Sequence, residues 1–265
     1  MDRLKKDFSK AALSYDKYSY VQRAAGSNLL DRLKFFNFEP QSILDLGCGT
    51  GFLTNELKQV WPRAKVTGVD IAPAMCEVAA KNYKDINFIC QDIYALDFRP
   101  NSQDLIVSNF TLQWCADLPR IFQNLLKIAR PDAMFIFATV GLGSLQEIRE
   151  SWAKVDRQKR LMDFLDMHDI GDMLLNAGWR DPVIDVERFT NYYSAIEDIF
   201  SEFKALGVTN KNPRRPRGLT GKAKLAGFKK NYESLRTGKG LPLSWEVIYG
   251  SCRKASGVRL NKTKP

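Results

Sequence analysis

Residues 42–51 read S-I-L-D-L-G-C-G-T-G, and this stretch decides the fold. The apolar run I-L-D-L predicts a short strand, the glycines that follow predict a tight turn, and residues 52–57 begin a helical pattern. Glycines allow dihedral angles that other residues avoid and let a ligand approach bare backbone. The first turn of the helix offers free N–H groups. The stretch therefore predicts a strand, turn and helix that bind a ligand.

Polar residues stand where the next predicted strands end. The strand V-T-G-V runs into Asp70, 19 residues after Gly51, the strand at 86–90 leads to Asp92, and the strand at 104–109 ends at Asn109. A carboxylate at the end of the second strand of a β-α-β unit can accept hydrogen bonds from both hydroxyls of a ribose. We expect these strand ends to form one ligand site.

Strands and helices alternate from residue 43 to about 139, which predicts an α/β fold with a parallel sheet and helices on both faces. Ligands bind at the carboxyl ends of such strands. The remaining elements are expected as helices within 1–38, 144–165, 169–177, 194–206 and 220–236, and as strands at 183–189 and 245–252.

Composition excludes several classes of protein. Hydrophobic residues make up 45% of the 265 residues, enough for a full core, and no run approaches the 18 apolar residues of a membrane span. The charged N-terminus lacks the apolar stretch of a signal peptide. Five scattered cysteines without a C-x-x-C pair indicate reduced thiols, no metal site and a cytoplasmic location.

The charge is very uneven along the chain. Residues 204–265 hold 16 Lys/Arg and 2 Asp/Glu, a net charge of +14, whereas residues 1–203 hold 24 and 28, a net charge of −4. A local basic surface predicts an acidic partner. The alternative is a solvated tail, which suits residues 254–265 better than 225–232, where basic and apolar residues alternate.

The D-x-G-x-G-x-G form of residues 45–51 resembles motif I of the class I S-adenosylmethionine-dependent methyltransferases. The resemblance implies a Rossmann-like, seven-stranded sheet with a helical lid, an antiparallel last strand, S-adenosyl-L-methionine as methyl donor and no metal. It implies a cofactor site made of Phe8, Tyr15, Gln22, Asp45, Gly47, Cys48, Gly49, Gly51, Asp70, Ile71, Asp92, Ile93 and Asn109. In that site Asp92 would bind the adenine amino group, and the residue after it would pack on the ring.

Other segments narrow the resemblance. The N-terminal F-S-K-A-A-L-S-Y-D at 8–16, S-N-F-T-L-Q-W-C at 108–115, R-G-L-T at 217–220 and G-L-P-L-S-W at 240–245 resemble the malonyl-acyl-carrier-protein O-methyltransferases of biotin synthesis. This resemblance covers nearly the whole chain. Departures are A-P-A for the usual A-P-G at 72–74 and P-D-A for the common P-G-G at 131–133, both away from the expected chemistry.

The resemblance implies methylation of the free carboxylate of a malonyl thioester. That carboxylate is ionised at neutral pH, so no general base is required, in agreement with a chain whose single histidine is His168. An arginine would hold the carboxylate bidentately. The residues expected to act on the acceptor are Tyr18, Gln113, Arg214 and Arg217. Arg149 is a third candidate for the arginine that binds the carboxylate, and Trp114 is expected in the pocket wall.

The basic last quarter would then dock a malonyl-loaded, acidic acyl carrier protein, without membrane or nucleic acid as partners.

We divide the chain by expected role. Residues 1–38 close the site, 39–143 bind the cofactor, 144–168 form a helical lid, 169–206 end the core sheet, 207–240 form a basic lid, 241–253 form the last strand and 254–265 a basic tail.

Three alternatives remain open from the sequence. The acceptor could be another small carboxylate or a quinone-ring carbon, which would need a base or an activated ring. It could be RNA, although the N-P-P-Y or D-P-P-Y step of base-amino methylation is absent after residue 108. A binding protein that lost catalysis is the third alternative, against which the intact glycines and Asp70 argue.

Overall fold

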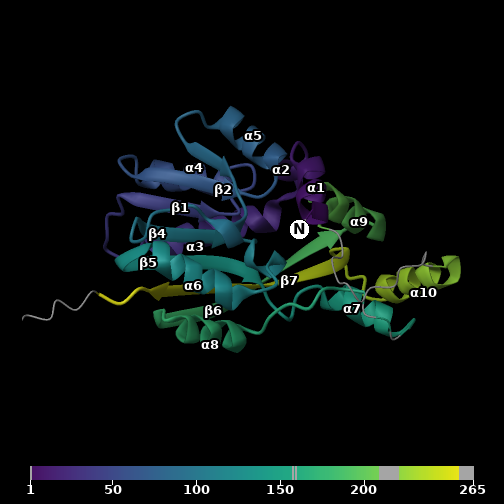
Figure 1. Ribbon diagram of the computed structural model, residues 1–265. Helices are drawn as coiled ribbons and strands as arrows, with labels where there is room; N and C mark the ends of the chain where they lie inside the picture. The colour runs from purple at the N-terminus through teal and green to yellow at the C-terminus, as the bar shows by residue number, and fades with distance from the viewer. Residues whose placement is uncertain (1, 157, 159, 209–220, 257–265) are drawn as a thin grey trace, which may run out of the picture.

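The computed structural model describes residues 2–156, 158, 160–208 and 221–256. In this part of the chain a seven-stranded sheet runs in the order β3-β2-β1-β4-β5-β7-β6 (Figure 1). The strands are β1 (Ser42–Leu46), β2 (Lys65–Asp70), β3 (Asn87–Cys90), β4 (Gln103–Asn109), β5 (Ala129–Val140), β6 (Arg180–Tyr193) and β7 (Leu241–Arg253). The helices are α1 (Asp2–Ala11), α2 (Tyr15–Tyr18), α3 (Tyr20–Leu33), α4 (Phe52–Val60), α5 (Pro73–Asn82), α6 (Leu118–Ile128), α7 (Gln146–Ala153), α8 (Met167–Ala177), α9 (Ile196–Ala205) and α10 (Lys222–Glu233). Two short 3-10 turns are η1 (Ile93–Ala95) and η2 (Leu112–Trp114).

Strands β1 to β5 are parallel, and β7 pairs antiparallel with both β5 and β6. The strand order reverses at β1, which lies between β2 and β4. In open α/β sheets this reversal leaves a crevice at the carboxyl ends of the strands, where ligands bind. The predicted α/β class, with its seven strands and antiparallel last strand, is confirmed.

The central strands of the sheet are buried on both faces, and their side chains alternate between two cores. On β5, Ile136 packs with α3 and α4 on one face, whereas Phe135 and Phe137 pack with α6 and α8 on the other. The second core is closed by Trp179, whose indole N–H donates to the carbonyl of Phe122 at 3.0 Å. The period of two along each strand fixes which side chains face which layer of helices.

Segments from both ends of the chain gather beyond the carboxyl ends of the strands. Helices α1, α7, α9 and α10 lie on one side of the sheet's end, as Figure 1 shows. Helix α10 carries Phe228 and Tyr232 fully buried on its inner face, with Trp152 of α7 stacked on Phe228 at 4.4 Å. The alternation of basic and apolar residues at 225–232 is therefore that of a packed amphipathic helix.

The structure corrects several predicted boundaries. Among the described residues of the expected helix at 144–165, only those of α7 form an α-helix. The charged residues after α7 lack apolar 3.6-residue periodicity, and Leu161 and Phe164 pack singly against the core. Strand β5 begins at Ala129 and passes through Pro131, with Asp132 at φ 64°. Both β6 and β7 are longer than predicted, since they pair with each other over most of their length. The N-terminal segment is three helices, with a turn at 12–14.

Candidate functional site

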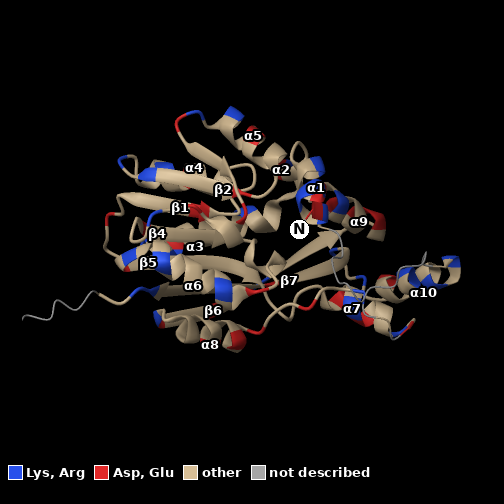
Figure 2. Ribbon diagram, in the orientation of Figure 1, with Lys and Arg blue, Asp and Glu red and all other residues tan. Residues whose placement is uncertain are grey.

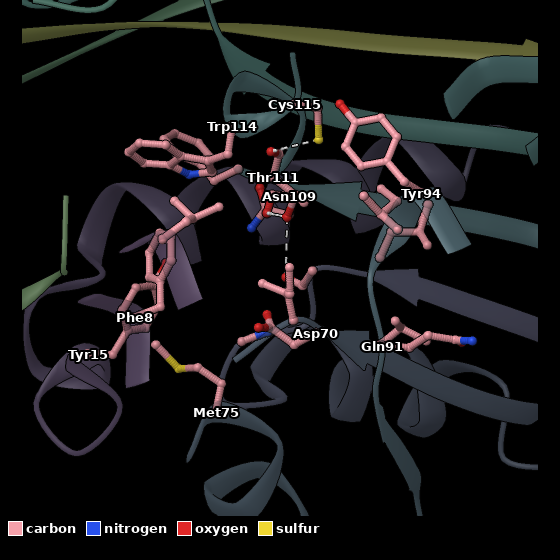
Figure 3. Close-up of a pocket in the computed structure, with 18 residues that line it drawn as sticks. Phe8, Tyr15, Asp70, Met75, Gln91, Tyr94, Asn109, Thr111, Trp114 and Cys115 are labelled. Carbon is pink, nitrogen blue, oxygen red and sulfur yellow. Dashed lines mark hydrogen bonds between the residues drawn. The ribbon is translucent and has the colours of Figure 1, made fainter. Parts of the chain in front are cut away.

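A cavity lies at the carboxyl ends of β1, β2 and β4 and is closed by α1 and α2 (Figure 3). Phe8 and Tyr15 lie on one side of it, across from Tyr94, with Asp70 and Met75 below. We call it the cofactor cavity. Its lining residues are Leu4, Phe8, Tyr15, Leu46, Gly47, Gly49, Val69, Asp70, Ile71, Met75, Gln91, Ile93, Tyr94, Asn109, Phe110, Thr111, Trp114 and Cys115.

The glycine turn after β1 forms the floor of this cavity. The backbone N–H of Gly47 donates to the carbonyl of Val69 at 2.7 Å. Gly47 has φ +70°, and a Cβ there would stand 1.9 Å from Oγ1 of Thr111. A Cβ on Gly49 would meet nothing within 4 Å, although its φ of +55° also lies in the left-handed region. Only glycine therefore fits at 47, because the turn packs directly against the segment that follows β4.

Asp70 lies at the end of β2 with its carboxylate in the cavity wall. Its two oxygens accept hydrogen bonds from the N–H of Gly49 at 3.0 Å and of Ala72 at 2.8 Å. Burial raises the pKa of Asp70. A carboxylate has about four acceptor positions. Two remain for the hydroxyls of a ribose, which suits the predicted role of Asp70.

Two buried acceptors stand next to this wall. The Asn109 amide donates through Nδ2 to the carbonyl of Gln22 at 2.8 Å. Oδ1 of Asn109 and Oε1 of Gln22 are buried and accept no hydrogen bond from any residue that the structure describes. A buried acceptor without a donor is costly. The ammonium group of S-adenosylmethionine supplies such donors, so these residues fit the predicted cofactor.

A second cavity adjoins the first and shares four aromatic residues with it: Phe8, Tyr15, Phe110 and Trp114. Phe8 meets Trp114 edge to face, with ring centroids 5.5 Å apart. We call this second cavity the acceptor chamber. Its other lining residues are Gln22, Gln113, Val140, Leu145, Ile148, Trp152, Arg160, Leu161, Met162, Phe164, Phe200, Phe203, Val208 and Trp245. The four shared residues separate the cavity that contains Asp70 and Asn109 from the acceptor chamber, and both linings are mostly apolar.

The cavities bring together most of the predicted cofactor residues. Those that line the cofactor cavity are Phe8, Tyr15, Gly47, Gly49, Asp70, Ile71, Ile93 and Asn109, and Gln22 lines the acceptor chamber. Asp45, Cys48, Gly51 and Asp92 line neither cavity. Each of these four has a structural position that explains why.

Asp45 lies beneath the turn and is 1% exposed, with Oδ2 accepting a 2.6 Å hydrogen bond from the hydroxyl of Thr54. Burial raises its pKa to about 7. Cys48 is buried between the turn and β2, close to Gly68. Gly51 begins α4 at φ 86°. Asp92 caps η1, accepting from the N–H of Tyr94 at 2.9 Å. These residues shape the cavity from behind its surface.

The residues predicted to act on the acceptor are placed unequally. Gln113 lines the acceptor chamber, but its amide is held at both ends, donating to the carbonyl of Phe110 at 2.6 Å and accepting from the hydroxyl of Thr139 at 3.1 Å. Tyr18 is half-buried and lines neither cavity. Arg214 and Arg217 lie outside the described residues.

Arg149 and the single histidine of the chain lie away from the chamber. Arg149 donates to the carbonyls of Leu142 and Ser144 at 3.1 and 3.4 Å and lines no part of the chamber. The His168 side chain is 79% exposed and pairs with Asp166 in the first turn of α8. Among the described residues, no cluster of three or more His, Cys, Asp or Glu side chains could hold a metal ion.

Sequence reasoning missed the residues that build the chamber from α7, α9 and the coil between α7 and α8, notably Trp152, Arg160 and Phe203. Trp152 and Phe203 stand on helices whose apolar periodicity only indicates burial. Arg160 stands in a charged coil that offers no pattern. Thr111 and Tyr94 of the cofactor cavity were also missed, although each lies within two residues of a predicted one.

Comparison with known proteins agrees with this geometry. Residues 44–137 match the model of a family described as "Methyltransferase domain". A solved S-adenosylmethionine-dependent methyltransferase of Thermotoga maritima, a possible histamine N-methyltransferase, covers 95% of this chain and 99% of its own, with a TM-score of 0.57 and 16% identity. That likeness concerns the fold. No described helix is both long and apolar enough to cross a membrane.

Sequence relatives are similar over almost the full length. The malonyl-[acyl-carrier protein] O-methyltransferase of Gallionella capsiferriformans is 36% identical over 98% of this chain and 92% of its own. The enzyme of the same name from Halorhodospira halophila is 37% identical over 93% of this chain and 85% of its own. The predicted resemblance is confirmed, and this chain belongs to the malonyl-[acyl-carrier protein] O-methyltransferase family.

Proposed function

We propose that this chain transfers the methyl group of S-adenosylmethionine to the free carboxylate of a malonyl thioester carried by acyl carrier protein, as in biotin synthesis. The observation that carries the proposal is a cofactor cavity, with Asp70 and Asn109 in its wall, that adjoins a second, mostly apolar chamber. The chain's relatives over almost the full length are named malonyl-[acyl-carrier protein] O-methyltransferase. When bound, the cofactor supplies an electrophilic methyl group on a sulfonium. The residues of this chain hold the two reactants and exclude water.

Residues of the cofactor cavity, and Gln22 of the adjoining chamber, each have a task in this proposal. Asp70 accepts from the ribose hydroxyls, while Oδ1 of Asn109 and Oε1 of Gln22 accept from the ammonium group. The aromatic rings of Phe8, Tyr15 and Trp114 border both cavities and so face the positive sulfonium, which aromatic faces attract. Alignment of reactants in this way supplies on the order of 7–11 kcal/mol toward the barrier.

The lining of the acceptor chamber favours a carboxylate acceptor over a ring carbon. The described lining contains no histidine, aspartate, glutamate or lysine that could remove a proton. Tyr15 keeps its proton, since burial and the neighbouring charges of Asp70 and Asp16 raise its pKa. A carboxylate is ionised at neutral pH and needs no base, whereas a carbon acceptor would.

The docking of acyl carrier protein is assigned to helix α10 in this proposal. Lys224 and Lys229 are paired with Asp156 and Glu197, respectively. Lys222 and Lys230 are exposed, and Figure 2 shows lysines along α10 close to α7. Because an acidic partner is steered by exposed charges, the contribution of Lys222 and Lys230 to docking should exceed that of the two paired lysines.

The activity is tested by incubating the purified protein with labelled S-adenosylmethionine and malonyl-acyl carrier protein. Succinyl- and acetyl-loaded carrier protein and bulk RNA serve as controls. Label on the malonyl species as a base-labile ester supports the proposal. Label on RNA alone, or on none of the substrates, refutes the assigned acceptor.

The docking helix is tested by the double variant Lys222→Glu/Lys230→Glu. We expect KM for malonyl-acyl carrier protein to rise about tenfold or more at low salt, with less than about a twofold change for malonyl-CoA. The variant Lys81→Glu/Lys84→Glu, with two exposed lysines near α5, is the matched control. Equal losses with both substrates would exclude α10 as the docking surface.

A further inference from the structure

The acceptor chamber has one charged side chain in its described lining, Arg160. It comes from the coil between α7 and α8, and its side chain is 13% exposed. The guanidinium carbon lies 3.9 Å from the ring centroid of Trp152, which is itself stacked on Phe228. A flat guanidinium held on an aromatic face presents its edge to neighbouring groups. The two rings therefore fix the plane in which Arg160 can donate.

Asp156 anchors this arginine from behind. Its Oδ2 is 2.7 Å from a terminal nitrogen of Arg160 and 3.1 Å from Nζ of Lys224 on α10. Those two hydrogen bonds, the one from Arg160 above all, lower the pKa of Asp156, which stays ionised. Two cations share one carboxylate, so the three charged groups keep a net positive charge beside the chamber.

Charge is the property that separates substrate from product in a carboxylate methylation. A carboxylate that enters an apolar chamber loses its hydration, which is costly unless a cation compensates. The methyl ester that forms is neutral and needs no cation. A guanidinium in the chamber wall would therefore bind the carboxylate substrate and release the methyl ester product. Its charge-assisted hydrogen bonds to the carboxylate are lost when the methyl group is transferred.

We propose that Arg160 binds the free carboxylate of the acceptor in the chamber and gives the site its preference for the anionic acid over the neutral ester. The inference rests on the proposed function and assigns its carboxylate-binding residue. It moves that role from Arg214 and Arg217 to an arginine of the coil after α7, whose position neither a motif nor a periodicity indicates.

The test measures binding to the protein loaded with S-adenosylhomocysteine, by calorimetry, with malonyl-pantetheine and its methyl ester as probes. The wild type should bind the acid at least about tenfold more tightly than the ester. Arg160→Gln should bring the two affinities within about twofold by weakening only the acid. Arg160→Lys should keep a preference for the acid, because the charge remains. Unchanged S-adenosylhomocysteine binding in both variants establishes that they are folded.

The matched control is Arg236→Gln, which removes an exposed arginine that pairs with Glu233 at the end of α10 and lines neither cavity. It should keep the wild-type preference. If Arg160→Gln also keeps it while the wild type methylates malonyl-acyl carrier protein, the inference on Arg160 is wrong and the proposed function stands. If the wild type methylates no malonyl species, the proposed function itself fails.

Discussion

The cofactor cavity and the acceptor chamber are neighbours that are built in different ways. The cofactor cavity is made at the ends of adjacent parallel strands, and backbone groups of Gly47, Gly49 and Ala72 hold it together. The acceptor chamber is walled mainly by side chains from α1, α7, α9, β7 and a coil. The first is rigid because its backbone is paired. The second depends on side-chain shape.

This difference predicts that backbone changes harm cofactor binding most. Gly47→Ala should weaken S-adenosylmethionine binding at least about 100-fold, because its Cβ would overlap Thr111 at 1.9 Å and φ is +70°. Gly238→Ala is the control, since a Cβ there meets nothing within 4 Å and Gly238 lines neither cavity. Calorimetric titration with the cofactor measures both. Equal affinities of the two variants would show that the turn is not rigid.

The buried acid beneath the turn predicts a dependence of stability on pH. The pKa of Asp45 is about 7 in the folded protein and near 4 when unfolded. Between these values the folded state binds more protons, so this contribution to the free energy of unfolding falls as pH rises from about 4 to 7. Asp45→Asn lacks this group.

The measurement for Asp45 is urea unfolding of both proteins at several pH values. The stability of Asp45→Asn relative to the wild type should increase with pH by on the order of 1 kcal/mol per pH unit inside that window. It should be constant above about pH 8. Parallel stability curves for the two proteins would mean that Asp45 carries its charge in the folded state at neutral pH.

Side-chain truncations should separate the two cavities. Phe203→Ala removes a half-buried ring of the acceptor chamber that meets Trp245 edge to face. It should raise KM for the acceptor about tenfold and leave the cofactor Kd within about twofold. Ile71→Ala, in the cofactor cavity, should raise the cofactor Kd about tenfold and leave KM for the acceptor within about twofold. Steady-state kinetics and calorimetry check both, and a variant that changes both constants equally would argue against independent cavities.

The smallest effects are expected at the hydrogen bonds that fasten the N-terminal helices. The Thr50 hydroxyl donates to Asp16 of α2 at 2.6 Å, whereas the Ser14 hydroxyl donates to the carbonyl of Ala205 in α9 at 3.1 Å. The first bond fastens α2 to the glycine turn below the cofactor cavity, and the second fastens the start of α2 to α9, which carries Phe200 and Phe203 of the acceptor chamber. Thr50→Val should weaken cofactor binding about two- to fivefold. Ser14→Ala should instead raise the acceptor KM by a similar factor. A change in acceptor KM alone for Thr50→Val, or in cofactor binding alone for Ser14→Ala, would contradict these assignments.

The polar residues of the strands show which part of the site can be predicted from the sequence. The strand ends predict that Asp70 and Asn109 lie close together, and both line one cavity, because parallel strands bring their carboxyl ends to the same edge. The same reasoning could not separate Asp70 from Asp45, since both are acidic residues of predicted strands. The side chain of Asp45 points beneath the turn to Thr54, and only the packed helix α4 reveals this.

By itself, the sequence determined the α/β sheet, its glycine turn and the family. The sheet and the turn follow from local patterns of apolar residues and glycines, and the family follows from short segments along the chain that resemble those of its members. The tertiary structure decided what surrounds the acceptor. Phe8, Arg160 and Trp245 are far apart in the chain and share one chamber because separate helices and strands pack against the same end of the sheet. Such contacts depend on tertiary packing, for which local periodicity carries no signal.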